Sequence, residues 1–209
     1  MQGIERRHAT NPNQVAPLLL DDLTRIVPLM GRSLPDVRDR ALLLVGFFGA
    51  LRRSEIVALN FDDVRFRENG LDLVIRKSKT DQLQAGRIIH LRRATTALDP
   101  AKALQVWLVQ GKIAEGPIYR CMGVPSRLSD HAVARIVKKW ASRIGHAAEH
   151  FSGHSLRAGF ATSAALAGLD PTLIARQTGH KSSKLWRLML GIAKVLASIA
   201  ENASTSFQV

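Results

Sequence analysis

Five residues in this sequence could act together on a phosphate, because each carries positive charge or donates hydrogen bonds: Arg52, Lys79, His154, Arg157 and His180. Attack on a phosphodiester places extra negative charge on its non-bridging oxygens. The guanidiniums of Arg52 and Arg157 could each hold two such oxygens, which a lysine ammonium cannot do. The imidazoles of His154 and His180 could add donors or exchange protons near neutral pH. Preorganised donors are usually the largest catalytic term, so the set predicts phosphodiester chemistry.

The five residues lie in four short motifs, which are GALRRSEI at 49–56, RKSKTDQ at 76–82, HSLRAGFAT at 154–162 and QTGHKS at 177–182. Each string is weak on its own, but the four in this order resemble the catalytic domain of the tyrosine recombinase, or phage integrase, family. The resemblance begins near Pro17 and leaves 1–16 as an N-terminal tail. It implies a mainly helical α+β fold with a small antiparallel β-sheet or hairpin over 17–209.

The resemblance also implies a role for each motif residue. Arg52 and Arg157 match the two catalytic arginines, and His154 and His180 match the histidines that stabilise the phosphate or handle protons. Lys79 matches the hairpin lysine that protonates the departing 5′ oxygen. No metal ion or cofactor is then required, which agrees with a sequence that has no cluster of carboxylates at metal-ligand spacing.

The sequence departs from the family where the attacking group is expected. By resemblance, a tyrosine nucleophile should stand nine residues after His180, but Met189 occupies that position. A thioether is no practical nucleophile for phosphate, and removing the nucleophile of a comparable covalent enzyme costs on the order of 10⁶ in rate. Tyr119, expected in a partly buried segment, and the short side chains of Ser182 and Ser183 are poor substitutes. We therefore expect defective cleavage.

Each assignment has a simpler structural alternative. Arg52 and Arg53 could end a helix at its negative pole. Lys77 and Lys79 could be solvated residues at a hairpin tip, and His154 could be a buried histidine with satisfied hydrogen bonds. These alternatives leave the shared order of the four motifs unexplained.

Three histidines repeat every four residues at His146, His150 and His154, a spacing that would align metal ligands on one helical face. Gly145 and Gly153 argue against a continuous helix there, and no cysteine completes a zinc set. We expect no metal site.

The acidic residues near the motifs are expected to be structural. Glu55 should pair with a nearby arginine or cap a helix rather than act in catalysis. The adjacent pairs at 21–22 and 62–63 lie near predicted element boundaries and are interpreted as caps or surface charges.

Hydrophobic periodicity predicts the elements that position these residues. Helices are expected over 17–30, 36–50, 56–59, from 100 onward, from 129 onward, over 154–167, over 170–179 and over 188–200. Ser129 is expected to start one of them, and Asp170 to cap another that has Pro171 at its first position and stops near Gly179. Two β-branched runs at 71–76 and 87–91 predict an antiparallel hairpin or small sheet, with Lys77 and Lys79 near its tip. No internal repeat or long linker occurs, so one mainly helical domain is the economical interpretation.

Composition limits the class of protein. Thirty Lys and Arg against 17 Asp and Glu give a net charge of +13, which favours nucleic acid as the partner. The longest apolar run, 41–51, is shorter than the roughly 18 residues of a membrane span, and no signal peptide precedes it. The single cysteine, Cys121, suits a reducing compartment. The sequence predicts a cytoplasmic protein with no membrane partner.

The main hypothesis is an integrase or recombinase homologue that binds double-stranded DNA in integration and site-specific recombination, with cleavage lost. Family members carry a further N-terminal core-binding domain, for which the residues before Pro17 leave no room, so we expect weak binding, mainly to phosphates. One alternative is a non-enzymatic basic DNA-binding protein that joins itself or an active recombinase through 188–200.

Two further alternatives remain. A degenerate gene remnant would explain why 186–200 departs from the family pattern while 201–203 resembles it again. An RNA-binding module has only the charge in its favour, because an aromatic content of 5% offers few stacking platforms.

Overall fold

The computed structural model describes residues 15–76 and 86–179. Its α-helices are α1 (Leu20–Ile26), α2 (Leu34–Phe48), α3 (Arg53–Ala58), α4 (Pro100–Gln110), α5 (Asp130–Arg143), α6 (Ser155–Leu166) and α7 (Pro171–Thr178). Its 3₁₀ turns are η1 (Val27–Leu29), η2 (Phe61–Asp63) and η3 (Ala148–His150), and its strands are β1 (Val64–Arg67), β2 (Gly70–Ile75) and β3 (Arg87–Arg92). None of the described helices is long and apolar enough to cross a membrane.

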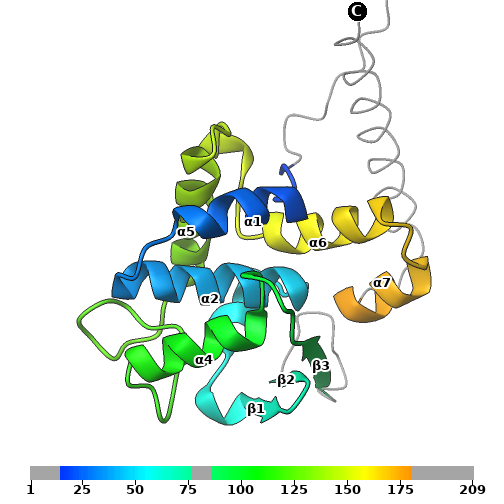
Figure 1. Ribbon diagram of the computed structural model, residues 1–209. Coiled ribbons are helices and arrows are strands. Elements are labelled where there is room, and N and C mark those ends of the chain that lie inside the picture. Colours follow the sequence, from blue (N-terminus) through cyan, green and yellow to red (C-terminus); the bar gives the residue numbers. More distant parts are fainter. Residues whose placement is uncertain (1–14, 77–85, 180–209) are drawn as a thin grey trace, which may run out of the picture.

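Helix α2 lies at the centre of the molecule and carries most of the long apolar run (Figure 1). Residues 41–45 are fully buried, as expected for a core helix. Its first turn is set by Ser33, whose hydroxyl accepts a hydrogen bond from the Asp36 N–H at 3.4 Å, and by Pro35, whose missing N–H is harmless there. Helices α3, α4 and α6 all contact α2, so this one buried helix holds together elements that are distant in sequence.

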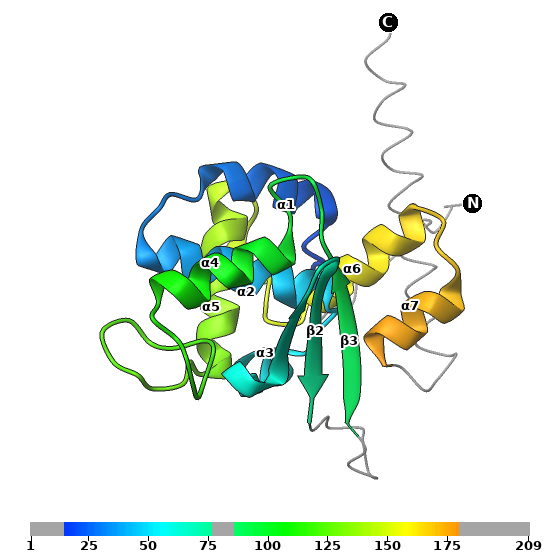
Figure 2. The same ribbon diagram turned by 60° about the horizontal axis from the view of Figure 1, so that its bottom comes forward.

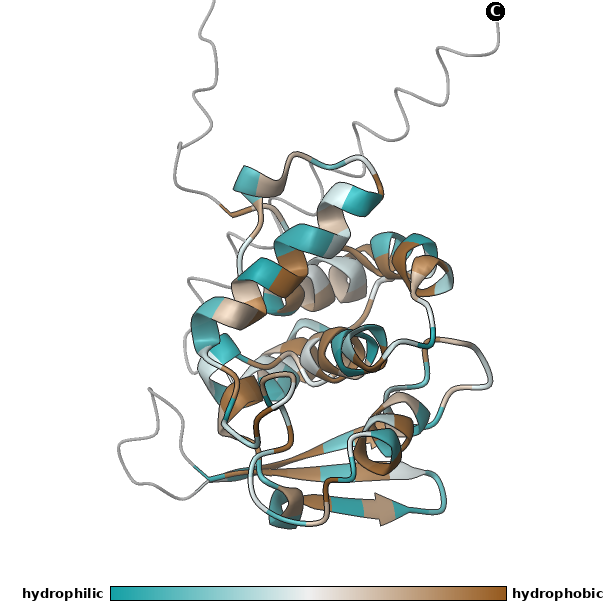
Figure 3. Cartoon of the chain, turned by 90° about the vertical axis from the view of Figure 1, so that its left-hand side faces the viewer, coloured by the Kyte–Doolittle hydropathy of each residue, from teal (hydrophilic) through white to brown (hydrophobic). Residues whose placement is uncertain are grey.

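The three strands form an antiparallel sheet in the order β1-β2-β3. Leu71 and Leu73 on β2 lie opposite Leu91 and Ile89 on β3, and all four are buried. Because side chains alternate across a strand, the sheet has one apolar face, and Figure 3 shows it as a layer beneath the helices. The predicted mainly helical α+β fold with a small antiparallel sheet is confirmed.

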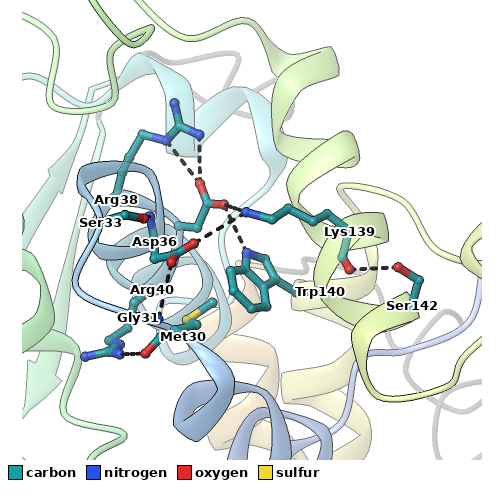
Figure 4. Close-up of polar contacts among 10 residues, drawn as sticks. Met30, Gly31, Ser33, Asp36, Arg38, Arg40, Lys139, Trp140 and Ser142 are labelled. Carbon is teal, nitrogen blue, oxygen red and sulfur yellow. Dashed lines mark hydrogen bonds and ion pairs between the residues drawn. The ribbon is translucent and has the colours of Figure 1, made fainter.

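A buried carboxylate joins α2 to α5 (Figure 4). Asp39, 1% exposed, accepts two hydrogen bonds from Arg38 through Oδ1. Its Oδ2 accepts from Lys139 Nζ at 3.1 Å and from Trp140 Nε1 at 3.0 Å. Both oxygens are therefore occupied, as a buried charge requires.

The caps predicted from sequence are present. Asp22 accepts from the Leu19 N–H at 2.8 Å, and Asp63 accepts from the Asn60 N–H at 2.9 Å. Ser129 caps α5, and Asp170 caps α7 by accepting from the Thr172 N–H at 2.6 Å. Helix α7 begins and ends where its Asp-Pro start and glycine stop predicted.

The first helix is shorter than the predicted 17–30. Helix α1 begins only at Leu20 and ends at Ile26, and Val27–Leu29 is a 3₁₀ turn. Pro28 lacks the N–H that an α-helix interior needs, so the apolar spacing continues while the α-helix does not.

Strand β1 was missing from the prediction. Its VRFR sequence has one half-buried residue followed by three exposed ones, so the alternation that marks a half-buried strand is absent. As the edge of the sheet it pairs only with β2, in a register that places Val64 opposite Leu73.

Candidate functional site

The first motif places Arg52 at the start of α3, where it is paired twice with Glu55. The Arg52 N–H donates to Glu55 Oε2 at 2.9 Å, and Arg52 Nη1 donates to Oε1 at 2.8 Å. Glu55 is 3% exposed. Burial alone would raise the pKa of Glu55, but the Arg52 N–H and the charges of Arg87 and Arg52 lower it. The predicted structural role of Glu55, as cap and ion-pair partner, is confirmed.

A second arginine, Arg87 at the start of β3, shares the same carboxylate. Its Nη2 lies 3.0 Å from Glu55 Oε2, and its side chain is 21% exposed. Burial and the charge of Arg52 lower the pKa of Arg87, and the nearby Glu55 opposes that shift. Arg87 belongs to none of the four sequence motifs. One signal was available, because Arg87 shares the inward face of β3 with Ile89 and Leu91, and an arginine on an apolar face needs a partner.

Arg157, on α6, supports the backbone just before Arg52. Its Nη1 donates to the Ala50 carbonyl at 2.8 Å. Ala50 has a φ of 47°, and hydrogen bonds from the Ala50 N–H to Phe47 O and from the Leu51 N–H to Gly46 O end α2 in a Schellman motif. An alanine therefore holds the left-handed position usually given to glycine. The hydrogen bond from Arg157 to its carbonyl stabilises this turn.

Arg157 is 6% exposed and still charged at neutral pH. Burial and the charges of Arg52 and Arg87 lower its pKa to about 10, while Glu55 opposes the shift. Among the described residues, three guanidiniums thus sit within electrostatic reach of the Glu55 carboxylate, and this part of the site carries net positive charge. Such a site favours an anion.

His154 caps the start of α6 with an exposed side chain. Partial desolvation and the positive charges of Arg53, Arg157 and Arg52 lower the pKa of His154. The imidazole is therefore neutral at neutral pH and can donate one hydrogen bond and accept another. Because the charges of all three arginines act on the pKa of His154, the imidazole lies at the same site as Arg52 and Arg157.

Close packing at Gly46 brings the two arginine motifs together. A Cβ on Gly46 would lie 2.8 Å from Ile56 Cδ1 of α3 and 2.8 Å from Leu156 Cδ1 of α6. Both side chains are fully buried. The bare backbone of α2 at this point lets α3 and α6 approach each other, and with them Arg52 and Arg157.

The described residues include the three regularly spaced histidines and Tyr119. His146 lies after the end of α5 and bonds to Asp22 at 2.8 Å, while His150 ends η3 and His154 caps α6, so the three histidines do not share a helix. Over 15–76 and 86–179 no group of three or more His, Cys, Asp or Glu could hold a metal ion.

Tyr119 is fully buried, its hydroxyl donates to the Ala41 carbonyl at 3.2 Å, and burial raises its pKa. It is unsuited to attack a phosphate.

Comparison with known proteins decides the family. The sequence matches the phage integrase family over residues 18–187. The chain belongs to this family. A relative named integrase/recombinase xerD homolog, from Selenomonas ruminantium, is 40% identical over 192 residues, which are 88% of this chain and 56% of the relative. Tyrosine recombinase XerC of Thermodesulfovibrio yellowstonii is 32% identical over 170 residues, 79% of this chain and 54% of the relative. The chain spans about half the length of these curated relatives.

Solved structures share the fold of this phage integrase domain. The XerH site-specific recombinase in a post-cleavage complex with its difH substrate aligns with a TM-score of 0.72 at 19% identity, covering 93% of this chain and 55% of that one. The XerA recombinase aligns with a TM-score of 0.68 at 21% identity, covering 90% and 61%. The fold is that of tyrosine recombinase catalytic domains. Members of this family are associated with DNA integration and site-specific recombination.

Within this phage integrase domain, the structure brings together Arg52, His154 and Arg157. Lys79, His180 and the Met189 position lie outside the described residues, as does the predicted helix over 188–200. Their roles stay predictions from the sequence motifs.

Proposed function

We propose that this chain is an integrase or recombinase homologue whose catalytic domain docks a DNA phosphodiester and is defective in cleavage. The observation that carries the proposal is the excess of guanidinium over carboxylate among the described residues of a largely buried site. Arg52 and Arg157 would hold the non-bridging oxygens, and neutral His154 would add a donor. Lys79 and His180 would complete the set from adjoining motifs. The loss of cleavage follows from Met189, which offers no hydroxyl.

Two properties of the site support preorganisation. Glu55 fixes both the backbone N–H and the guanidinium of Arg52. Arg157 is fixed by the Ala50 carbonyl. Donors that are held in place before the anion arrives do not have to reorganise during binding. Electrostatic stabilisation is most effective under that condition.

The partner in this proposal is double-stranded DNA. Lambda integrase, which shares the fold with a TM-score of 0.61 at 18% identity, has been solved as a dimer bound to a COC′ core site. Because the described cations suit phosphate oxygens, this domain should contact DNA mainly through phosphates, with little sequence preference. Binding would take place in the cytoplasm and would need neither a metal ion nor a cofactor. Self-association, or pairing with an active recombinase, would use 188–200, and removing those residues should then abolish the complex in size-exclusion chromatography.

A nicked suicide substrate tests the proposal. The unaltered chain should form no covalent protein–DNA adduct, because no tyrosine hydroxyl is expected near the phosphate. Met189→Tyr should form an adduct that survives denaturing electrophoresis, since it returns the missing nucleophile to an otherwise intact site. Met189→Phe is the matched control, because it adds the ring without the hydroxyl and should stay inactive.

Two outcomes would contradict the proposal. An adduct from the unaltered chain would mean that cleavage is not lost. If the chain fails to bind duplex DNA at low salt, the phosphate-docking role is wrong. Adding Arg157→Gln to Met189→Tyr should remove any adduct, which checks that the described site carries the reaction.

A further inference from the structure

Arg87 connects two parts of the site that come from different motifs. One end of its guanidinium, Nη2, lies 3.0 Å from Glu55 Oε2 beside Arg52. The other end, Nη1, lies against the last turn of α7, because a Cβ on Gly179 would be only 1.9 Å from it. Figure 2 shows β3 as the edge strand nearest to α7. The side chain therefore spans the gap between α3 and α7.

The contact at Gly179 suits a guanidinium for two reasons. Gly179 ends α7 with a φ of 65° and a ψ of 33°, a left-handed cap in which glycine is favoured. The end of a helix carries partial negative charge, so a cation beside it is stabilised. The absence of a side chain at Gly179 leaves the space that Arg87 Nη1 occupies.

The placement of Arg87 has an energetic penalty that its contacts must offset. Its Nε is buried, and no hydrogen-bond partner for it lies within the described ranges. Burial also lowers the pKa of the group. A compact lysine ammonium could not reach Glu55 and the α7 terminus together, whereas the planar fork of arginine does.

We propose that Arg87 is a positioning residue, which sets the distance between the Arg52–Glu55 pair and the end of α7. His180 follows Gly179 directly in the sequence, so Arg87 would fix where the Gly-His motif leaves its helix. This inference rests on the proposed function in that it assigns Arg87 to the phosphate-docking site. Arg87 itself acts through Glu55 and Gly179, not by holding the phosphate.

NMR spectroscopy of the DNA-free protein tests the geometry directly. The backbone amides of Gly179 and His180 and the imidazole of His180 should shift in both Arg87→Lys and Arg87→Met. Arg92→Met is the matched control, because Arg92 lies on the same strand with its side chain exposed, and it should leave these resonances unchanged. Unshifted Gly179 and His180 signals in Arg87→Lys would overturn the proposal.

DNA affinity separates geometry from charge. Arg87→Lys keeps the charge but loses the fork, so a positioning role predicts about tenfold weaker binding to duplex DNA, comparable to Arg87→Met. Arg92→Lys should bind as the unaltered protein does. If Arg87→Lys keeps full affinity while Arg87→Met loses it, Arg87 supplies only charge and the proposal fails.

A double-mutant cycle tests the contact from the other side. Gly179→Ala forces a methyl group into the space of Arg87 and strains the left-handed cap, and the strain is the same in any background. Its loss of affinity should therefore be severalfold larger in the unaltered protein than in Arg87→Ala. Equal losses would rule out the coupling. A chain that does not bind DNA would refute the proposed function, and the NMR comparison would still decide the role of Arg87.

Discussion

Glu55 is the one carboxylate that Arg52 and Arg87 share at the described site. Its Oε1 accepts from Arg52, and its Oε2 accepts from the Arg52 N–H and from Arg87. Removing it would take this shared negative charge away from two partly buried guanidiniums. In a buried ion pair, the partner left behind accounts for most of the destabilisation.

We expect Glu55→Ala to lower the free energy of unfolding by about 3–5 kcal/mol, measured by urea denaturation. Asp130→Ala is the control, since Asp130 pairs with Arg53 at 3.3 Å with both side chains more than a third exposed, and it should change stability by less than about 1 kcal/mol. Equal effects of the two variants would contradict the central role of Glu55.

The stabilisation by Glu55 should also be visible in how the free energy of unfolding depends on pH. The folded pKa of Glu55 lies below its ordinary value of 4.5. Its stabilisation is therefore complete above that value and is lost as the pH falls through the folded pKa. Unfolding titrations of the protein and of Glu55→Gln should converge in that acidic range.

His154 should couple DNA binding to proton uptake. Partial desolvation and the neighbouring arginines lower the pKa of the free imidazole, and a bound phosphate would raise it again. Affinity for duplex DNA should therefore increase as the pH falls from about 7.5 toward the ordinary histidine value of about 6.5 and below. His154→Gln should flatten this dependence in fluorescence anisotropy titrations. An unchanged pH profile in that variant would assign the uptake to another group.

At the scale of the elements, the site depends on how closely α3 and α6 approach α2. Gly46→Ala would place a methyl group against Ile56 and Leu156, which are fully buried. Overpacking of this kind typically destabilises by about 1–3 kcal/mol. Thermal unfolding measures that loss, and DNA affinity should fall as well, because the two arginines move apart. A variant that is destabilised but binds normally would show that the approach does not set the site.

The elements that the sequence located best are those whose ends are marked by capping residues. Asp170, Pro171 and Gly179 defined α7 without any tertiary information. Strand β1 could not be found, because an exposed edge strand has no apolar alternation, and Pro28 shortened a helix whose apolar spacing continued past it. Local signals therefore set boundaries more reliably than hydrophobic spacing did.

The same distinction applies to the site. Arg52, His154 and Arg157 were identified through sequence motifs, and the structure brings them together. Arg87 carries no motif, and its partners Glu55 and Gly179 are distant in the sequence. Only the pairing of the strands and the packing of α7 reveal that contact.

At the scale of the whole molecule, the net charge of +13 should dominate affinity for DNA. The logarithm of the binding constant should fall linearly with the logarithm of the salt concentration, with a slope of about −0.9 for each phosphate contacted. Arg157→Gln should reduce the magnitude of that slope by about one contact. Arg67→Gln, in an exposed pair with Asp72 on the sheet, is the comparison. An unchanged slope for Arg157→Gln would place the site away from the DNA.

The bond from Arg157 to the Ala50 carbonyl has an evolutionary consequence. This arginine braces the turn that ends α2, a helix at the centre of the core. Natural selection for a chain that merely folds would therefore keep Arg157, even in a lineage that no longer moves DNA. Among descendants of such a gene, Arg157 would be conserved because the fold requires it. A survey of inactive homologues should find Arg157 conserved more often than residues that serve chemistry alone.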